Sequence, residues 1–159
     1  MKNHSNSNGV GLMWVVASVL IVSRGASVMW NLLPSDCDET MNYYEPSHFL
    51  LFSRGLQTWE YSPVFALRSY FYLGIHLVVP WILGHFFGLN FISSKVTVFL
   101  LIRSFLALLT VIIETTLVHA IRVRFNAHDN RRLMGLRLGD LASIITTAIL
   151  ALSPGLFVS

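Results

Sequence analysis

An apolar run from Val10 to Leu33, interrupted by a single charged residue, Arg24, constrains the fold of this chain more than any other feature. A transmembrane helix needs about 20 consecutive apolar residues, so the run is long enough to cross a bilayer. It exceeds the about 7–15 apolar residues of a cleaved signal peptide. Pro34 follows the run and ends it. We therefore predict an uncleaved signal-anchor helix behind a short N-terminal tail, residues 1–9.

The composition supports a membrane protein. Hydrophobic residues make up 54% of the chain and charged residues 12%, whereas soluble domains contain about 25% charged residues. The mean hydropathy is +0.62. The net charge of +3 is better explained by cytoplasmic loops than by nucleic-acid binding, so we expect no nucleic-acid partner. Cys37 is the single cysteine, which excludes an intrachain disulfide and a cysteine-based metal cluster.

Three further apolar segments follow, at Phe71–Ile92, Val96–Ile121 and Leu141–Val158. The first of them is interrupted by proline, glycine and histidine, so it either spans the membrane or forms a kinked or re-entrant element. The sequence predicts an all-α, polytopic membrane helix bundle with about 3–4 membrane segments. An acidic loop, residues 34–68, and a basic loop, residues 122–140, connect them.

The acidic loop contains a predicted turn at Glu45–His48, followed by a short amphipathic stretch at Phe49–Ser53. The five arginines in residues 122–137 should be cytoplasmic by the positive-inside rule. A cytoplasmic N-terminus would place the acidic loop on the luminal side. Both placements hold only if residues 71–92 do not cross the membrane completely. We favour a luminal acidic loop and leave that crossing open.

Half of the eight acidic residues lie between positions 36 and 45. Asp36, Asp38 and Glu39 begin this cluster directly after the first apolar run. Neighbouring carboxylates raise one another's pKa, which suits a general base acting on a sugar hydroxyl, or a cation site. The alternative is a solvated acidic loop at the start of a helix.

Charged residues inside the apolar segments have two explanations. Arg24 either contacts a lipid phosphate, or snorkels or pairs with another span. Arg103 and Glu114 lie within about 20° on one helix face but about 16 Å apart, so we expect each to face the bundle interior and find a separate partner.

Histidines and aromatic residues are less informative. The histidines do not show metal-ligand spacing on one element, so we expect no metal site; those considered are His48, His76, His85 and His119. Trp59 and Tyr61 either stack on a sugar ring or belong to an interfacial aromatic belt.

Three blocks of sequence resemble one protein family. They are Asp36-Cys37-Asp38-Glu39-Thr40-x-Asn42-Tyr43-x-Glu45-Pro46-x-His48, then Gly55-x-Gln57-Thr58-Trp59-Glu60-Tyr61-Ser62-Pro63, then Ala66-x-Arg68-Ser69-Tyr70. In this order they are similar to the N-terminal signature of the endoplasmic-reticulum α-1,2-mannosyltransferases of glycosyltransferase family 22. These enzymes assemble lipid-linked oligosaccharides and have the GT-C membrane fold. The resemblance extends over essentially all of the chain after about residue 10.

The resemblance implies a defined reaction. Mannose passes from dolichyl-phosphate-mannose, on the luminal side of the endoplasmic-reticulum membrane, to a dolichyl-diphosphate-linked oligosaccharide in α-1,2 linkage. The configuration at the anomeric carbon inverts, and a luminal carboxylate acts as general base. No cofactor and no metal ion is implied. The expected partners are the donor, the acceptor and the lipid bilayer.

The resemblance also implies roles for individual residues. It favours Asp38 as the base and Glu39 as its partner, with Asp36 as the third candidate catalytic residue. The implied substrate-contacting or site-shaping residues are Asn42, Tyr43, Glu45, His48, Gln57, Trp59, Glu60, Arg68 and Arg24.

Members of this family run to several hundred residues, so we expect the present chain to be an N-terminal fragment that carries one wall of the site. The alternative is a truncated, non-catalytic membrane protein or scaffold that retains the family's N-terminus. A transporter is a third class, supported by Arg103 and Glu114 inside an apolar segment, although no internal repeat accompanies them.

Overall fold

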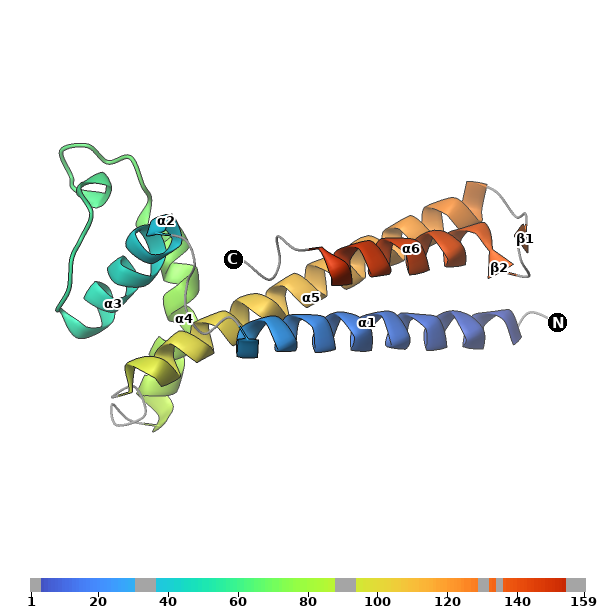
Figure 1. The fold of residues 1–159 in the computed structure, drawn as a ribbon, viewed down its shortest axis with the longest axis horizontal. Helices are drawn as coiled ribbons and strands as arrows, with labels where there is room; N and C mark the ends of the chain where they lie inside the picture. Colours follow the sequence, from blue (N-terminus) through green and yellow to red (C-terminus); the bar gives the residue numbers. More distant parts are fainter. Residues whose placement is uncertain (1–3, 31–36, 88–93, 129–131, 134–135, 154–159) are drawn as a thin grey trace. The chain divides into compact units, whose positions relative to one another are not determined.

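The computed structural model describes residues 4–30, 37–87, 94–128, 132–133 and 136–153 (Figure 1). It confirms that the chain is all-α. The elements in chain order are α1 (His4–Trp30), α2 (Cys37–Glu39), the π-helical turn η1 (Thr40–Tyr44), α3 (Glu45–Phe52), the 3-10 turn η2 (Trp59–Tyr61), α4 (Tyr70–Phe87), α5 (Lys95–His128), β1 (Arg132–Leu133), β2 (Leu136–Arg137) and α6 (Leu138–Leu152). The two short strands pair antiparallel, Arg132 with Arg137 and Leu133 with Leu136.

Two of the described helices are long and apolar enough to cross a membrane, at Val10–Trp30 and Lys95–Ala127. They correspond to the first and third predicted spans. The other two apolar helices are shorter, Tyr70–Phe86 and Leu138–Leu152. A bundle of three or four spans therefore remains a prediction.

The chain divides into two compact units. The first consists of Met1–Met29 and Ala107–Leu156, and the second is built mainly from Trp30–Leu106. Helix α5 contributes its C-terminal part to the first unit and its N-terminal part to the second.

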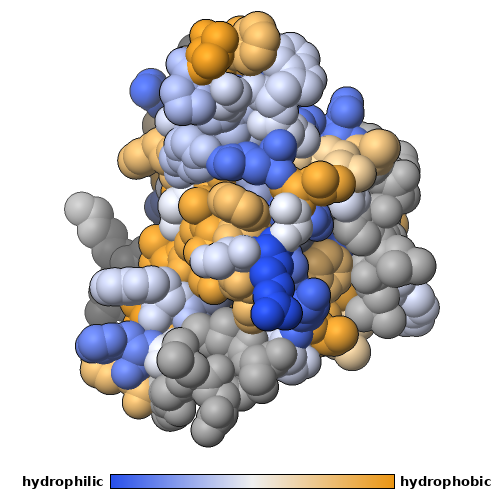
Figure 2. Space-filling view, turned by 90° about the vertical axis from the view of Figure 1, so that its left-hand side faces the viewer, coloured by the Kyte–Doolittle hydropathy of each residue, from blue (hydrophilic) through white to orange (hydrophobic). Residues whose placement is uncertain are grey.

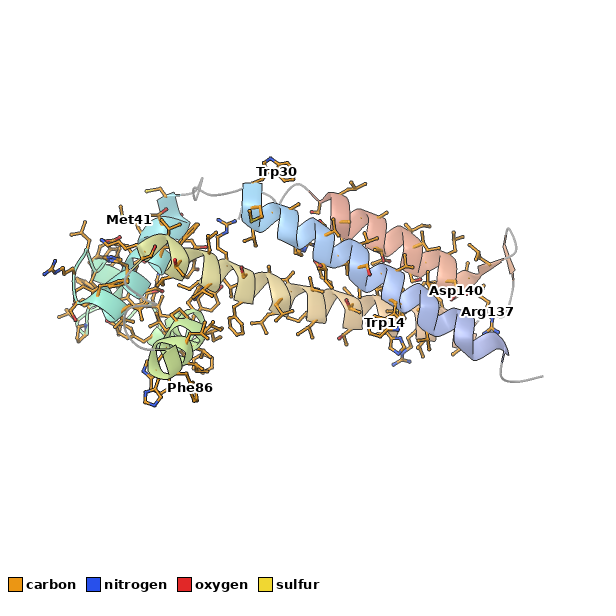
Figure 3. All side chains as sticks on the ribbon, turned by 90° about the horizontal axis from the view of Figure 1, so that it is seen from below. Trp14, Trp30, Met41, Phe86, Arg137 and Asp140 are labelled. Atoms are coloured by element: carbon orange, nitrogen blue, oxygen red, sulfur yellow. The ribbon has the colours of Figure 1, made fainter. Side chains whose placement is uncertain are left out.

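In the first unit, α1 and α6 run alongside the C-terminal part of α5 (Figure 1). The core contains Val16 and Leu20 from α1, with Val111 and Val118 from α5, and Leu150 of α6 packs against it. Val16 and Leu20 are four residues apart, and Val111 and Val118 are seven apart, so each pair lies on one face of its helix. Large apolar side chains also cover the outer faces; Trp14 and Trp30, for example, are exposed on α1 (Figure 3).

The acidic segment differs from the prediction. Glu45–His48 is not a turn: Glu45 begins helix α3, and Pro46 occupies its first turn. Proline fits there because the first helical N–H groups have no intrahelical acceptor. The helix ends at Phe52, where Ser53 takes a left-handed conformation and donates its N–H to the Phe49 carbonyl at 2.8 Å.

The basic segment also differs. Helix α5 continues to His128, so Arg122 and Arg124 belong to a helix and not to a loop. Arg122 is half-buried because its Nε donates to Asp140 Oδ1 on α6 at 2.6 Å. The prediction failed because it treated closely spaced arginines as solvated loop charge. The predicted segment Leu141–Val158 begins earlier, at Leu138, and its last residues lie outside the described part of the chain.

Candidate active site

Asp38, the candidate base, lies at the start of a short series of consecutive helical elements. Helix α2, the π-turn η1 and helix α3 follow one another without a break from Cys37 to Phe52. Asp38 lies in α2 and is exposed, whereas Asn42, one turn further on, is buried. π-Helical turns are rare and occur often at functional sites. The fold thus presents one acidic side chain to solvent beside a distorted, partly buried turn.

The remaining members of the acidic cluster cannot be placed in the same way. Asp36 lies outside the described residues. Glu39 is part of α2, but its side chain lies outside the description too. The catalytic assignments of Asp36, Asp38 and Glu39 therefore stay predictions.

Arg68, Glu60 and Tyr43 come together in the second unit. Arg68 Nε forms an ion pair with Glu60 Oε2, and its Nη1 donates to the Tyr43 hydroxyl at 3.5 Å. The Arg68 guanidinium also lies over the Tyr43 ring, 5.9 Å from its centroid. The backbone N–H groups of Leu67 and Arg68 both donate to the Glu60 carbonyl, at 3.1 and 3.2 Å. Backbone hydrogen bonds and the side-chain ion pair thus both hold Arg68 next to Glu60.

The Glu60 carboxylate sets the electrostatics of this group. By accepting the hydrogen bond from Arg68, it raises the pKa of that guanidinium above its ordinary value, although partial desolvation opposes the shift. Both side chains are part-exposed, 33% for Arg68 and 25% for Glu60. A ligand can therefore reach a permanently charged donor and an adjacent carboxylate.

Tyr61 ties the loop to the π-turn. Its hydroxyl donates to the Asn42 carbonyl at 2.6 Å, and its ring is almost completely buried. Burial raises the pKa of the Tyr61 phenol, and the nearby Arg68 charge opposes that shift. Tyr70 donates to the Tyr61 carbonyl at 3.3 Å and accepts a hydrogen bond from Gln57 Nε2.

Glu45 and His48 meet the chain just after α3. Glu45 Oε1 accepts the N–H of Leu56 at 3.0 Å. Gly55 has φ +123°, and a Cβ there would collide with Glu45 Oε1 and press on His48 Nδ1. Only glycine combines this backbone conformation with so close an approach. The first turn of α3 therefore fixes where the loop begins.

Trp59 lies apart from these contacts. It is 59% exposed and packs edge-on against Phe65, with ring centroids 5.2 Å apart. Other exposed apolar side chains of this loop are Leu56, Val64 and Leu67. Figure 2 shows a face on which hydrophobic and hydrophilic side chains are interspersed. This exposure is compatible with both interpretations of Trp59, stacking on a sugar ring and membership of an interfacial aromatic belt.

Two aromatic residues of helix α4 contact Tyr43, and this was not predicted from the sequence. Tyr72 and His76 contact each other and both contact Tyr43. Their spacing of four residues on a helix was the available signal, because it places both on one face. His76 was considered only as a metal ligand, and the segment otherwise only for its ability to cross a membrane.

Arg24 belongs to the first unit. Its Nε donates to Glu114 Oε2 at 3.1 Å, and its Nη2 contacts Glu114 Oε1 and the Leu150 carbonyl, the latter at 3.2 Å. Arg24 and Glu114 are 4% and 7% exposed. The structure confirms that Glu114 and Arg103 are buried and that Glu114 pairs with another helix. A contact between Arg24 and a substrate stays a prediction.

Over the described ranges, no group of three histidine, cysteine, aspartate or glutamate side chains lies close enough to hold a metal ion.

Comparison with known proteins identifies the family. The model of the Alg9-like mannosyltransferase family matches residues 14–158. Alpha-1,2-mannosyltransferase alg9 of Schizosaccharomyces pombe is 43% identical over 125 residues, which cover 79% of this chain and 20% of the relative. Alpha-1,2-mannosyltransferase ALG9 of Homo sapiens is 38% identical over 125 residues, covering 79% of this chain and 18% of the relative.

A further relative, alpha-1,2-mannosyltransferase algn-9 of Caenorhabditis elegans, is 38% identical over 116 residues, covering 73% of this chain and 18% of the relative. The chain thus spans about a fifth of the length of the curated relatives that it matches. No solved structure matches it. The family match extends from the first apolar helix through the acidic segment and the Arg68 loop to the last helix, and this chain belongs to the Alg9-like mannosyltransferase family.

Proposed function

We propose that the protein to which this chain belongs transfers mannose in α-1,2 linkage from dolichyl-phosphate-mannose to a dolichyl-diphosphate-linked oligosaccharide. The observation that carries this proposal is the family match over residues 14–158, whose relatives are named alpha-1,2-mannosyltransferases. The match includes the acidic segment and the loop that holds Glu60 and Arg68. This activity belongs to the precursor pathway of protein N-glycosylation.

In the proposed reaction, Asp38 acts as general base. Its carboxylate takes the proton of the acceptor 2-hydroxyl while that oxygen attacks the anomeric carbon of mannose. The bond from that carbon to the phosphate oxygen breaks, and dolichyl phosphate leaves with the electron pair. Attack opposite the leaving group converts the β-linked donor into an α-linked product. The exposure of Asp38 supports this role, because a base must reach its proton within hydrogen-bond distance.

Glu39 is the proposed partner of Asp38, and Asp36 is the third carboxylate of the cluster.

The proposed substrate contacts lie on the loop that follows α3. Arg68 and Glu60 offer a charged donor and an acceptor to sugar hydroxyls, and Trp59 offers an exposed ring face. Asn42, Tyr43, Glu45, His48 and Gln57 shape the surroundings through the contacts described above. Arg24 is buried and paired with Glu114, which favours its interpretation as a pair with another span over a contact to a lipid phosphate.

The apolar helices α1 and α5 support a location in a membrane, which we propose is that of the endoplasmic reticulum. The acidic segment would then face the lumen, where the proposed lipid-linked donor presents its mannose.

Replacement of the proposed base tests this function. Asp38→Asn in the full-length protein should lower dolichyl-phosphate-mannose-dependent transfer by about 10²–10⁴-fold, because a general base contributes about that much. Cys37→Ser is the matched control, since Cys37 is an exposed neighbour in the same helix. It should transfer at the wild-type rate. Undiminished transfer by Asp38→Asn would remove Asp38 as the base.

Glu39→Gln separates the two neighbouring carboxylates. We expect a smaller loss than for Asp38→Asn, because in the proposed reaction Asp38, and not Glu39, takes the acceptor proton. The reverse ranking of the two variants would exchange their assigned roles.

A further inference from the structure

The rings of Tyr43, Tyr72 and His76 form a closed cluster in which each contacts the other two. Tyr43 and His76 are stacked, with centroids 5.9 Å apart and ring planes 11° apart. Tyr72 meets both edge-on, at 5.0 Å from Tyr43 and 4.7 Å from His76. These are favourable arrangements for aromatic pairs. The cluster joins helix α4 to the π-turn that follows Asp38.

His76 is the fixed end of this cluster. Its side chain is almost completely buried, with 3% exposure, on the same face of α4 as Leu73 and Pro80. Its Nδ1 lies 3.0 Å from the Tyr72 carbonyl, one turn earlier in the helix. Packing and this contact together restrict the ring to one orientation.

Tyr43 links His76 to the loop, because its ring contacts both His76 and Arg68. One side of its ring faces His76, and Arg68 lies over the ring and donates to the hydroxyl at 3.5 Å. Arg68 in turn is paired with Glu60. An unbroken series of contacts therefore leads from the buried His76 side chain on α4 to the part-exposed ion pair.

We propose that His76 and Tyr72 are positioning residues, which hold Tyr43 so that Arg68 and Glu60 keep the orientation in which they meet the substrate. This inference rests on the proposed function for the substrate contact itself. Neither residue touches the reacting atoms. Loss of the His76 ring would let Tyr43 turn away, and Arg68 would lose its aromatic support while keeping its charge.

Two substitutions of similar size distinguish the contribution of the His76 aromatic ring from that of its nitrogen atoms. His76→Phe keeps an aromatic ring for stacking, and His76→Leu fills the space without one. His85→Leu is the matched control, since His85 stacks on Trp81 in the same helix, with centroids 6.0 Å apart, but is exposed. Leucine is a good helix former in an apolar helix, which favours folding of both leucine variants.

The first readout is hydrogen exchange of the full-length protein over residues 60–68. His76→Leu should accelerate exchange of the Leu67 and Arg68 amides about tenfold, because the contacts that hold the loop are lost. His76→Phe and His85→Leu should exchange like the wild type. Unchanged exchange in His76→Leu, or equal acceleration in His76→Phe, would overturn the proposal.

The second readout is transfer kinetics. His76→Leu should raise KM about tenfold and change kcat less than about twofold, because a displaced substrate contact weakens binding in the ground and transition states alike. A fall in kcat at constant KM would contradict a positioning role. If the wild-type protein transfers no mannose, the proposed function fails, and hydrogen exchange still decides whether His76 positions the loop.

Discussion

At the scale of single residues, the Arg24–Glu114 pair shows how a charge is accommodated in an apolar bundle. A buried guanidinium is costly unless its charge and its hydrogen bonds are both satisfied. Glu114 supplies the countercharge from α5, and the Leu150 carbonyl supplies another acceptor from α6, while Arg24 Nη1 has no hydrogen-bond partner among the described residues. One side chain of α1 thus contacts both other helices of its unit.

Breaking this pair on one side should be more harmful than removing both partners. Glu114→Gln should destabilise the protein by about 3–5 kcal/mol, because the Arg24 charge stays buried without a countercharge. The double variant Arg24→Met with Glu114→Leu should recover most of that loss. Thermal unfolding in detergent measures both. A stability of Glu114→Gln equal to that of the wild type would refute the pairing.

Tyr61 gives a prediction about pH. Burial raises its pKa, so the neutral phenol is favoured in the folded state. The resulting stability is complete below the ordinary pKa of 10.0 and is lost as pH rises through the higher folded value. Tyr61→Phe should be about 1 kcal/mol less stable at neutral pH, because it lacks the bond to Asn42.

Comparing wild type with Tyr61→Phe above pH 10 checks the direction of the Tyr61 pKa shift. The difference between wild type and Tyr61→Phe in thermal unfolding should shrink there, because the ionised phenol no longer donates to the Asn42 carbonyl. A difference that grows with pH would show that the folded state favours the ionised form.

At the scale of elements, the junction between α5 and α6 depends on a close backbone approach. A Cβ at Gly139 would overlap the Arg122 carbonyl and the Asn126 side chain. Asn126 Oδ1 accepts the Gly139 N–H at 3.1 Å, and Arg122 pairs with Asp140 next to it. The start of α6 is thereby fixed to the end of α5 within the first unit.

Gly139→Ala should therefore destabilise the protein by about 2 kcal/mol or more, since a rigid backbone atom occupies the space. Gly25→Ala is the control, because no atom lies within 4 Å of a Cβ there. It should be neutral or stabilising by about 0.5–1 kcal/mol, as for alanine replacing glycine inside a helix. Thermal unfolding measures both, and equal effects would contradict the close approach.

The length of the apolar runs predicted α1 and α5 well, because both helices are almost continuously apolar over a length that can cross a membrane. The errors fell on short segments rich in polar residues. Glu45 and Pro46 suggested a turn, yet both are also favourable in the first turn of a helix. Arg122 suggested a solvated loop because its partner, Asp140, lies beyond the strands and could not be inferred from local sequence.

At the scale of the whole molecule, family signature and geometry contribute different parts of the candidate site. The sequence motif led to Tyr43, Glu60 and Arg68, which the structure brings together. It did not lead to Tyr72 or His76. Their spacing places both on one face of α4, but the contact of that face with Tyr43 depends on tertiary packing, which the local sequence does not encode.

We propose that this chain supplies part of a mannosyltransferase active site, and a chimera is the sharpest test of that proposal. This chain would replace the matching segment of the Schizosaccharomyces pombe alpha-1,2-mannosyltransferase alg9, with and without Asp38→Asn. Transfer from dolichyl-phosphate-mannose should stay within about tenfold of the parent and fall by at least about 100-fold with Asp38→Asn. A chimera that inserts into the membrane but transfers no mannose would show that this chain does not supply the site, and one that is indifferent to Asp38→Asn would show that Asp38 is not the base.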